Sequence, residues 1–206
     1  MPNQVARRSR QLELRLHPRG GKRPGAGRKP KGARAGVSHL ERPQFARMLP
    51  VHVTVRVANH VYNLRSRRAF SAIGRAIGAA ADRFGMRIVQ FSVQGNHIHL
   101  VVEADDTEAL SRAMQGLSIR LAKRLNAMMD RRGRVLADRY HGRPLRTPTE
   151  VRRAVRYVRE NHRKHMAQVG QSVPRAWVDP YTSEGAGIAL PKARTWLLRT
   201  GASPPE

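Results

Sequence analysis

Two apolar runs between residues 86 and 104 place the strongest limit on how this chain folds. A Gly-Asn pair at 95–96 separates them, and apolar runs joined at such a pair are typical of a β-hairpin. Because side chains alternate between the two faces of a strand, His97 and His99 project to one side. The two imidazoles then lie about 7 Å apart, close enough to bind one divalent cation. Two solvated histidines on a half-exposed strand are the plainer interpretation.

The segments that precede the hairpin predict a strand and a helix. Residues 51–57 alternate polar and apolar side chains strictly, as a half-buried strand does. Residues 67–84 carry apolar side chains at helical spacing, and Gly85 offers a C-terminal stop. The apolar positions of this predicted helix are Phe70, Ile73, Ile77, Ala80 and Phe84.

The segments that follow the hairpin complete a known arrangement. Residues 105–108, Asp-Asp-Thr-Glu, supply capping groups for a second helix. Its apolar stripe consists of Leu110, Met114, Leu117, Leu121, Leu125 and Met128. We expect a short strand within residues 134–145. The resulting order β-α-β-β-α-β predicts an α+β, ferredoxin-like (split βαβ) fold, in which both helices cover one face of an antiparallel sheet.

A third helix is expected after the sheet. Residues 147–150, Thr-Pro-Thr-Glu, combine a capping box with proline at the first helical position, and the helix should run to about His165. Its apolar stripe consists of Val151, Ala154, Val155 and Val158, with Arg152, Arg156, Arg159 and Arg163 on the opposite side. Tyr157 and Asn161 lie on one edge of the stripe, four residues apart, and therefore share a face.

The charge of the chain points to a polyanionic partner. Forty Lys and Arg residues against fourteen Asp and Glu give a formal net charge of +26, and phosphate contacts by such residues release counterions from nucleic acid. We expect no membrane partner, because no stretch approaches the ~20 apolar residues that span a bilayer. The chain has no cysteine, which excludes thiolate metal sites and cysteine nucleophiles. A cytoplasmic, nucleoid-associated protein fits best.

Composition divides the chain into three parts. Residues 1–46 lack hydrophobic periodicity and are rich in Gly, Pro and Arg, which predicts a disordered, DNA-binding extension; residues 20–32 resemble an AT-hook. Residues 47–167 form the predicted domain, and residues 168–206 a tail that packs on it. The candidate DNA-binding residues are Lys22, Arg23, Arg28 and Lys29 in the extension, Arg120, Lys123 and Arg124 on the second helix, and Arg139, Arg143 and Arg146 around the last strand.

If the third helix docks beside the sheet, its side chains complete a site. Two imidazoles and the amide oxygen of Asn161 make a three-ligand set with open positions, which suits Mg²⁺ or Mn²⁺. Zinc usually takes a third His, Cys or carboxylate instead. Tyr157 would be the nucleophile, and a phenol with a pKa near 10 needs an adjacent cation to react as phenolate. Tyr140 is expected to be structural or to contact DNA.

The segments at 95–102, Gly-Asn-His-Ile-His-Leu-Val-Val, and 157–161, Tyr-Val-Arg-Glu-Asn, resemble those of the His-hydrophobe-His (HUH) single-tyrosine nucleases. The similarity is greatest to the insertion-sequence-200-like transposases, especially the REP-associated tyrosine transposases, and covers roughly residues 49–167. It implies Mg²⁺- or Mn²⁺-dependent cleavage and rejoining of single-stranded DNA near hairpins through a 5′-phosphotyrosine. By matching positions, the metal ligands are His97, His99 and Asn161, and the nucleophile is Tyr157.

Some alternatives stay open at this point. REP-associated relatives often have proline after the asparagine, where this chain has His162, so His165 is a second candidate for the third ligand. The same fold also suits a non-catalytic, domesticated nucleic-acid-binding protein, or a metal-dependent phosphodiesterase in which water attacks. Monomer and homodimer are equally compatible with the sequence.

Overall fold

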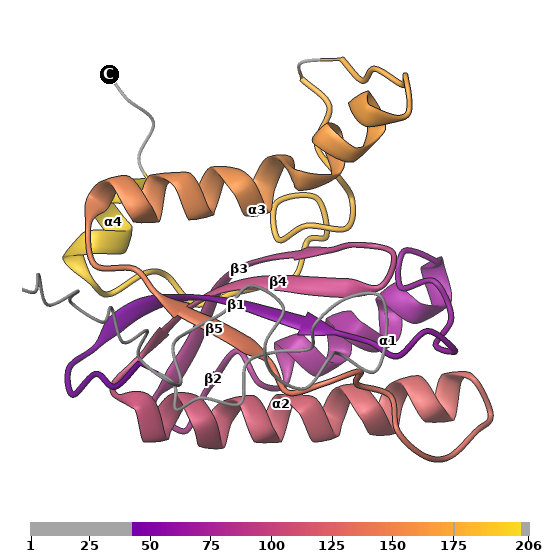
Figure 1. Ribbon diagram of the computed structural model, residues 1–206, viewed down its shortest axis with the longest axis horizontal. Coiled ribbons are helices and arrows are strands. Elements are labelled where there is room, and N and C mark those ends of the chain that lie inside the picture. Colours follow the sequence, from indigo (N-terminus) through magenta and orange to yellow (C-terminus); the bar gives the residue numbers. More distant parts are fainter. Residues whose placement is uncertain (1–42, 175, 203–206) are drawn as a thin grey trace, which may run out of the picture. The chain divides into compact units, whose positions relative to one another are not determined.

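The computed structural model describes residues 43–174 and 176–202 (Figure 1). Lys22, Arg23, Arg28 and Lys29 of the predicted DNA-binding extension lie outside these described residues. Within them, no helix is both long enough and apolar enough to cross a lipid bilayer.

An antiparallel sheet of five strands forms the centre of the described part, in the order β2-β3-β4-β1-β5. The strands are β1 (Leu49–Arg56), β2 (Asp82–Arg83), β3 (Met86–Val93), β4 (His97–Ala104) and β5 (His141–Pro144). The helices are α1 (Arg67–Gly78), α2 (Thr107–Met128), α3 (Pro148–Gln168) and α4 (Trp196–Ala202). Apart from the two-residue β2, this is the ferredoxin-like arrangement that the sequence predicts, with α3 added.

Two helical layers cover opposite faces of the sheet. Figure 1 shows α1 and α2 on one side and α3 with α4 on the other. Strand β4 divides its side chains accordingly: Leu100 and Val102 enter the larger core with α1 and α2, whereas Val101 joins the smaller core with α3 and α4. Because residues alternate along the strand, His97 and His99 lie on the α3 face together with Val101.

The predicted hairpin is confirmed. Strands β3 and β4 pair antiparallel and are joined by residues 94–96, where the Gln94 N–H donates to the carbonyl of His97. Strand β1 pairs with the other edge of β4, so that Thr54 lies directly opposite His99. The central strand is thereby fixed on both edges, which holds the histidine pair on a rigid part of the sheet.

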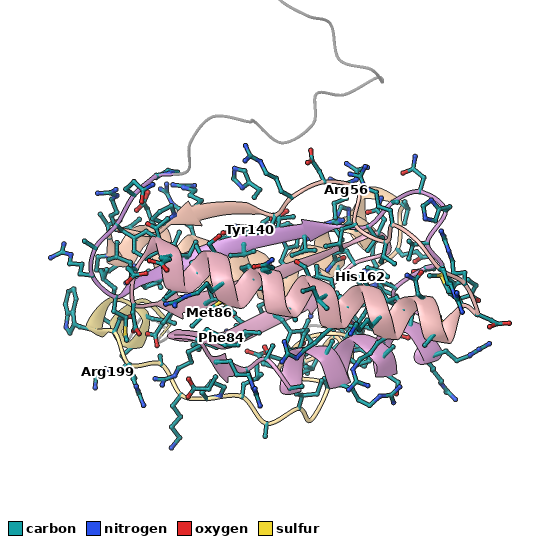
Figure 2. All side chains as sticks on the ribbon, turned by 90° about the horizontal axis from the view of Figure 1, so that it is seen from below. Arg56, Phe84, Met86, Tyr140, His162 and Arg199 are labelled. Carbon is teal, nitrogen blue, oxygen red and sulfur yellow. The ribbon has the colours of Figure 1, made fainter. Side chains whose placement is uncertain are left out.

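The first helix ends earlier than its apolar spacing predicts. Helix α1 stops at Gly78, and Phe84 is 54% exposed in a turn instead of buried on a helix face (Figure 2). Strands β2 and β3 form a short hairpin here, and both residues of its turn have positive φ: 56° at Phe84 and 73° at Gly85. Two-residue hairpin turns of this kind need positive φ at both positions, which glycine provides. Gly85 therefore serves a strand turn, and the prediction of a helix stop there was wrong.

The later helices begin where the sequence predicts. The side chain of Asp106 accepts from the N–H of Ala109 at the start of α2, and Thr147 accepts from that of Glu150 at the start of α3. Helix α3 continues to Gln168, slightly beyond the predicted end. Its buried stripe consists of Val151, Ala154, Val155 and Val158 and packs on Val101, Leu145 and Leu198. This packing sets the position of α3 over the sheet.

Candidate functional site

Strand β4 and helix α3 bring three aromatic side chains together on one face of the sheet. The ring centroids of His97 and His99 are 4.7 Å apart, and those of His99 and Tyr157 are 5.0 Å apart. Both ring pairs meet edge to face. The helix thus docks so that its tyrosine contacts the histidine pair, which the spacing within α3 could not establish by itself.

Two residues of β1, which the sequence analysis did not single out, belong to the same cluster. The Nε2 atom of His52 lies 3.3 Å from Nδ1 of His99, and the Oγ1 atom of Thr54 lies 3.2 Å from that same nitrogen. The His52 ring also meets the Tyr157 ring edge to face, with centroids 5.8 Å apart. Strict alternation places both residues on one face of the strand, but only the register between β1 and β4 brings them to His99.

Burial keeps the histidines of the cluster neutral at pH 7. Burial, and after it the neighbouring His141 and Arg143, lowers the pKa of His52 to about 4; burial, and after it the neighbouring histidines, lowers the pKa of His99 to about 3. The pKa of His97 is also lowered, first by burial and then by His165 and Arg56. A neutral imidazole has one nitrogen lone pair available, so each ring can accept a hydrogen bond or bind a cation.

Two buried polar atoms, one on β4 and one on α3, lack a hydrogen-bond partner within residues 43–174 and 176–202. These are Nε2 of His99 and Nδ2 of Asn161, and buried polar groups of this kind usually have one. Asn161 is 3% exposed and lies one helical turn beyond Tyr157. A half-turn of the Asn161 amide about its Cβ–Cγ bond places the amide oxygen, a possible metal ligand, where the nitrogen lies.

The side chains of His97, His99 and Asn161 offer ligand atoms that fit a hard divalent cation. Imidazole nitrogens with an amide oxygen suit Mn²⁺ or Mg²⁺, with Mn²⁺ favoured by the imidazoles. In the described part of the chain, no cluster of three or more His, Cys, Asp or Glu side chains can hold a metal ion. Asn161 on α3 is therefore the candidate for a third protein ligand beside the histidine pair, with the open positions left to water or phosphate oxygens. His165, the alternative ligand, is exposed on α3 and acts on both histidines as a neighbouring charge.

A basic cleft opens beside Tyr157. It has a volume of about 490 Å³ and is lined by His52, Arg143, Leu145, Glu150, Arg153, Ala154, Arg156, Tyr157 and Lys164. Tyr157 is 37% exposed, and Lys164 Nζ lies 5.8 Å from the centre of its ring. Four of the lining side chains are cationic, and the single carboxylate, Glu150, pairs with Arg143 at 2.8 Å. Such a cleft suits a phosphodiester chain.

The other predicted DNA-binding residues are not gathered at this cleft. Arg120, Lys123 and Arg124 lie on α2, in the helical layer on the other side of the sheet; Figure 2 looks onto that layer. Arg139 precedes β5, and Arg146 follows β5 and lies in a pocket near Leu49. Of the predicted DNA-binding residues that the structure describes, only Arg143 lines the cleft beside Tyr157.

Tyr140 and His162, which the sequence analysis also considered, lie away from the cluster around His99. Tyr140 is 8% exposed in the larger core, which agrees with a structural role. His162 is only partly buried and lies beside Trp177, with ring centroids 6.0 Å apart, instead of in the apolar stripe of α3.

The segment between α3 and α4 forms polar contacts with earlier parts of the chain. Arg65 forms two hydrogen bonds with the buried carboxylate of Asp179, and Arg159 on α3 pairs with Glu184 at 2.6 Å. Further along, the carboxylate of Glu103 on β4 accepts the backbone N–H groups of Arg194 and Thr195 just before α4. These contacts tie α3 to the segment that follows it, and the start of α4 to the strand that carries the histidines.

Comparison with known proteins gives a family and a fold. A family model described as "Transposase IS200 like" matches residues 48–161, more than half of the chain. A REP-associated tyrosine transposase solved bound to a REP hairpin is 17% identical, covering 63% of this chain and 74% of that one, with a TM-score of 0.51. A candidate transposase from Deinococcus radiodurans is 11% identical, covering 65% and 100%, with a TM-score of 0.42. No curated protein matches the chain.

Proposed function

The chain belongs to the family of IS200-like transposases, and on that premise we propose that it cleaves and rejoins single-stranded DNA beside hairpins with Tyr157 as nucleophile. The observation that carries this proposal is the contact between Tyr157 and His99 at the mouth of a basic cleft. A helix-surface tyrosine without a role would not need a buried, neutral histidine beneath it.

The proposed reaction exchanges one phosphoester for another. The phenol oxygen of Tyr157 attacks the scissile phosphorus, and the bond from phosphorus to the 3′ oxygen breaks. The products are a 5′-phosphotyrosine and a free 3′-OH, with the phenolic proton released and a proton taken up by the leaving oxygen. Because the new bond is again a phosphodiester, an incoming 3′-OH can reverse the step and join the strands. A hydrolase has no need of this property.

The residues around Tyr157 would bind the cation, stabilise negative charge and position the DNA strand. His97, His99 and Asn161 would hold Mg²⁺ or Mn²⁺, which when bound would polarise the scissile phosphate. Lys164 would stabilise negative charge as it develops on the phenol oxygen. Arg143 and the other cations of the cleft would contact phosphates on either side of the cleaved bond, positioning the strand without reading its sequence.

The proposed substrate follows from charge and from the fold relative. The formal net charge of +26 favours a polyanion, and the related solved transposase is bound to a REP hairpin. Residues 1–46 are proposed to add non-specific contacts to DNA, residues 47–167 to form the catalytic domain, and residues 168–206 to act as its supporting tail. No membrane partner is included in this proposal.

Trapping of a covalent adduct tests the proposal. The full chain is incubated with Mn²⁺ and a hairpin-bearing single strand labelled at its 3′ end, because the fragment on that side keeps the 5′ phosphate. A labelled protein band on a denaturing gel is expected, and it should disappear in Tyr157→Phe and His97→Ala. Tyr62→Phe is the matched control, since Tyr62 is 58% exposed and lies in the connection before α1.

The same experiment separates the two rival functions. Cleavage that leaves a free 5′ phosphate and no adduct would show that water attacks, as in a phosphodiesterase. Binding of the hairpin without cleavage would show a non-catalytic DNA-binding protein. Either result would refute the tyrosine mechanism.

A further inference from the structure

Strand β1 presents His52 and Thr54 to a single atom of the site. We propose that these two residues are positioning residues, which fix the tautomer and the orientation of His99 so that its Nε2 lone pair is directed at the bound cation. This inference rests on the proposed function and deepens it. It concerns residues that make no contact of their own with the cation.

The register of the sheet creates the arrangement. Thr54 lies directly opposite His99 across the β1–β4 pair, and side chains of directly paired residues share a face of the sheet. His52 lies two residues earlier on β1 and so shares that face. Their polar atoms reach the same nitrogen, Nδ1 of His99, at 3.3 Å from His52 and 3.2 Å from Thr54.

The two nitrogens of His99 have opposite surroundings. A proton on Nδ1 finds two acceptors, the hydroxyl oxygen of Thr54 and Nε2 of His52. A proton on Nε2 finds none among the residues that the structure describes, because that atom is buried and lacks a partner. An unsatisfied buried donor costs about 1–3 kcal/mol. The Nδ1–H tautomer is therefore favoured, and it leaves the lone pair on Nε2.

Stacking fixes the ring in the same orientation. The rings of His52 and His99 stack with centroids 5.3 Å apart and an interplanar angle of 30°. Tyr157 meets His99 edge to face at 5.0 Å. Hydrogen bonds to the far nitrogen of a metal-binding histidine commonly set its tautomer and ring plane, and their loss weakens metal binding by about 10- to 100-fold.

Nuclear magnetic resonance on the full chain tests the tautomer without metal or DNA. Long-range ¹H–¹⁵N spectra distinguish the protonated from the unprotonated imidazole nitrogen. At pH 7, His99 should be protonated at Nδ1 in the unchanged protein and should become a mixture in Thr54→Val, which replaces the hydroxyl with a methyl group of similar size. A proton found at Nε2 of His99 in the unchanged protein would overturn the inference.

Titration with Mn²⁺, followed by loss of the signal of the free ion in electron paramagnetic resonance, tests the consequence. The double variant His52→Leu/Thr54→Val should bind Mn²⁺ about 10- to 100-fold more weakly. Thr54→Ser, which keeps the hydroxyl, should bind as the unchanged protein does. His60→Leu is the matched control, because His60 is exposed, lies outside the cluster around His99 and forms a hydrogen bond with the carbonyl of Arg134.

The outcomes separate this inference from the proposed function. Unchanged Mn²⁺ affinity in the double variant, or an equal loss in Thr54→Ser, would overturn the positioning role. If the unchanged protein bound Mn²⁺ no better than His97→Ala, the metal part of the proposed function would fail instead. The tautomer measurement would then still decide by itself whether His52 and Thr54 control the His99 ring.

Discussion

Replacing Glu103 with glutamine should destabilise the protein by about 2 kcal/mol. Glu103 lies on β4, is 1% exposed, and accepts three groups of the segment before α4. Its Oε1 is 2.7 Å from both the backbone N–H nitrogen and the hydroxyl of Thr195, and its Oε2 is 2.8 Å from the backbone nitrogen of Arg194. One carboxylate thus joins the central strand to the C-terminal segment.

The magnitude follows from what glutamine can still accept. With its oxygen turned toward Thr195, the amide keeps both bonds from Thr195 and the longer, 3.0 Å contact with the Arg194 N–H, but all of them lose their charge assistance. Hydrogen bonds to charged groups contribute about 1.5–3 kcal/mol and neutral ones about 0.5–1.5 kcal/mol. The amide NH₂ then faces the Arg194 N–H, donor against donor. The weaker hydrogen bonds and the two donors that face each other lower the free energy of unfolding. Glutamine also avoids the cost of burying a charge, which offsets part of this loss and leaves a net destabilisation of about 2 kcal/mol.

Thermal and urea unfolding measure this loss. For a domain of this size, about 2 kcal/mol lowers the melting temperature by about 4–8 °C. Glu108→Gln is the matched control, because Glu108 is 78% exposed with a single partner at 3.8 Å, and it should cost less than about 1 kcal/mol. The double variant Glu103→Gln/Thr195→Val should cost less than the sum of its single changes, since Glu103→Gln weakens the same bond from the Thr195 hydroxyl that Thr195→Val removes. Additive losses, or a Glu103→Gln melting curve unchanged from the wild type, would refute the reasoning.

Three further measurements follow from the structure. Hydrogen bonds from the Arg146 backbone N–H and the Arg143 side chain lower the pKa of Glu150 from its ordinary value of 4.5. The ionised carboxylate therefore stabilises the folded protein fully above that pH, and this contribution is lost on acidification. In Glu150→Gln, the melting temperature should depend less on pH between pH 3 and 6 than in the unchanged protein. Gly201→Ala should destabilise by about 1–3 kcal/mol in urea unfolding, because a Cβ there would lie 2.6 Å from Cγ1 and 2.7 Å from Cβ of Val151 and 3.0 Å from the carbonyl oxygen of Pro148. Arg153→Ala should reduce the salt dependence of single-strand binding by about one phosphate contact; an unchanged slope in filter-binding titrations would exclude Arg153 from the DNA path.

Local signals in the sequence predicted most of the elements correctly. The hairpin around residues 94–96 and the helix starts at Asp106 and Thr147 depend on short-range chemistry: a turn pair and capping side chains. The end of α1 was predicted wrongly, because apolar spacing up to Phe84 fits a helix. The positive φ of Phe84 and Gly85 reflects instead pairing between β2 and β3, and a pairing preference is not contained in helical periodicity.

The candidate site was predicted only in part, because it is built across strands. The histidine pair stood out through its spacing in the hairpin, and Tyr157 through its spacing from Asn161 in the third helix. The structure brings His97, His99 and Tyr157 together. His52 and Thr54 have no distinctive local pattern, and their importance depends on the register between β1 and β4. Likewise, a count of positive charges cannot tell which cations share a face with Tyr157; Arg124, on α2, does not.

The two halves of the site belong to different cores. The histidines lie on the sheet, which the larger core with α1 and α2 stabilises, whereas Tyr157 and Asn161 lie on α3, which the smaller core with α4 holds in place. Regions with less buried apolar contact open more often than the rest of a protein. Transient release of α3 would therefore withdraw Tyr157, the proposed nucleophile, while leaving the histidine pair folded. Under the proposed function, cleavage of DNA would then require both helical layers to be packed on the sheet at once.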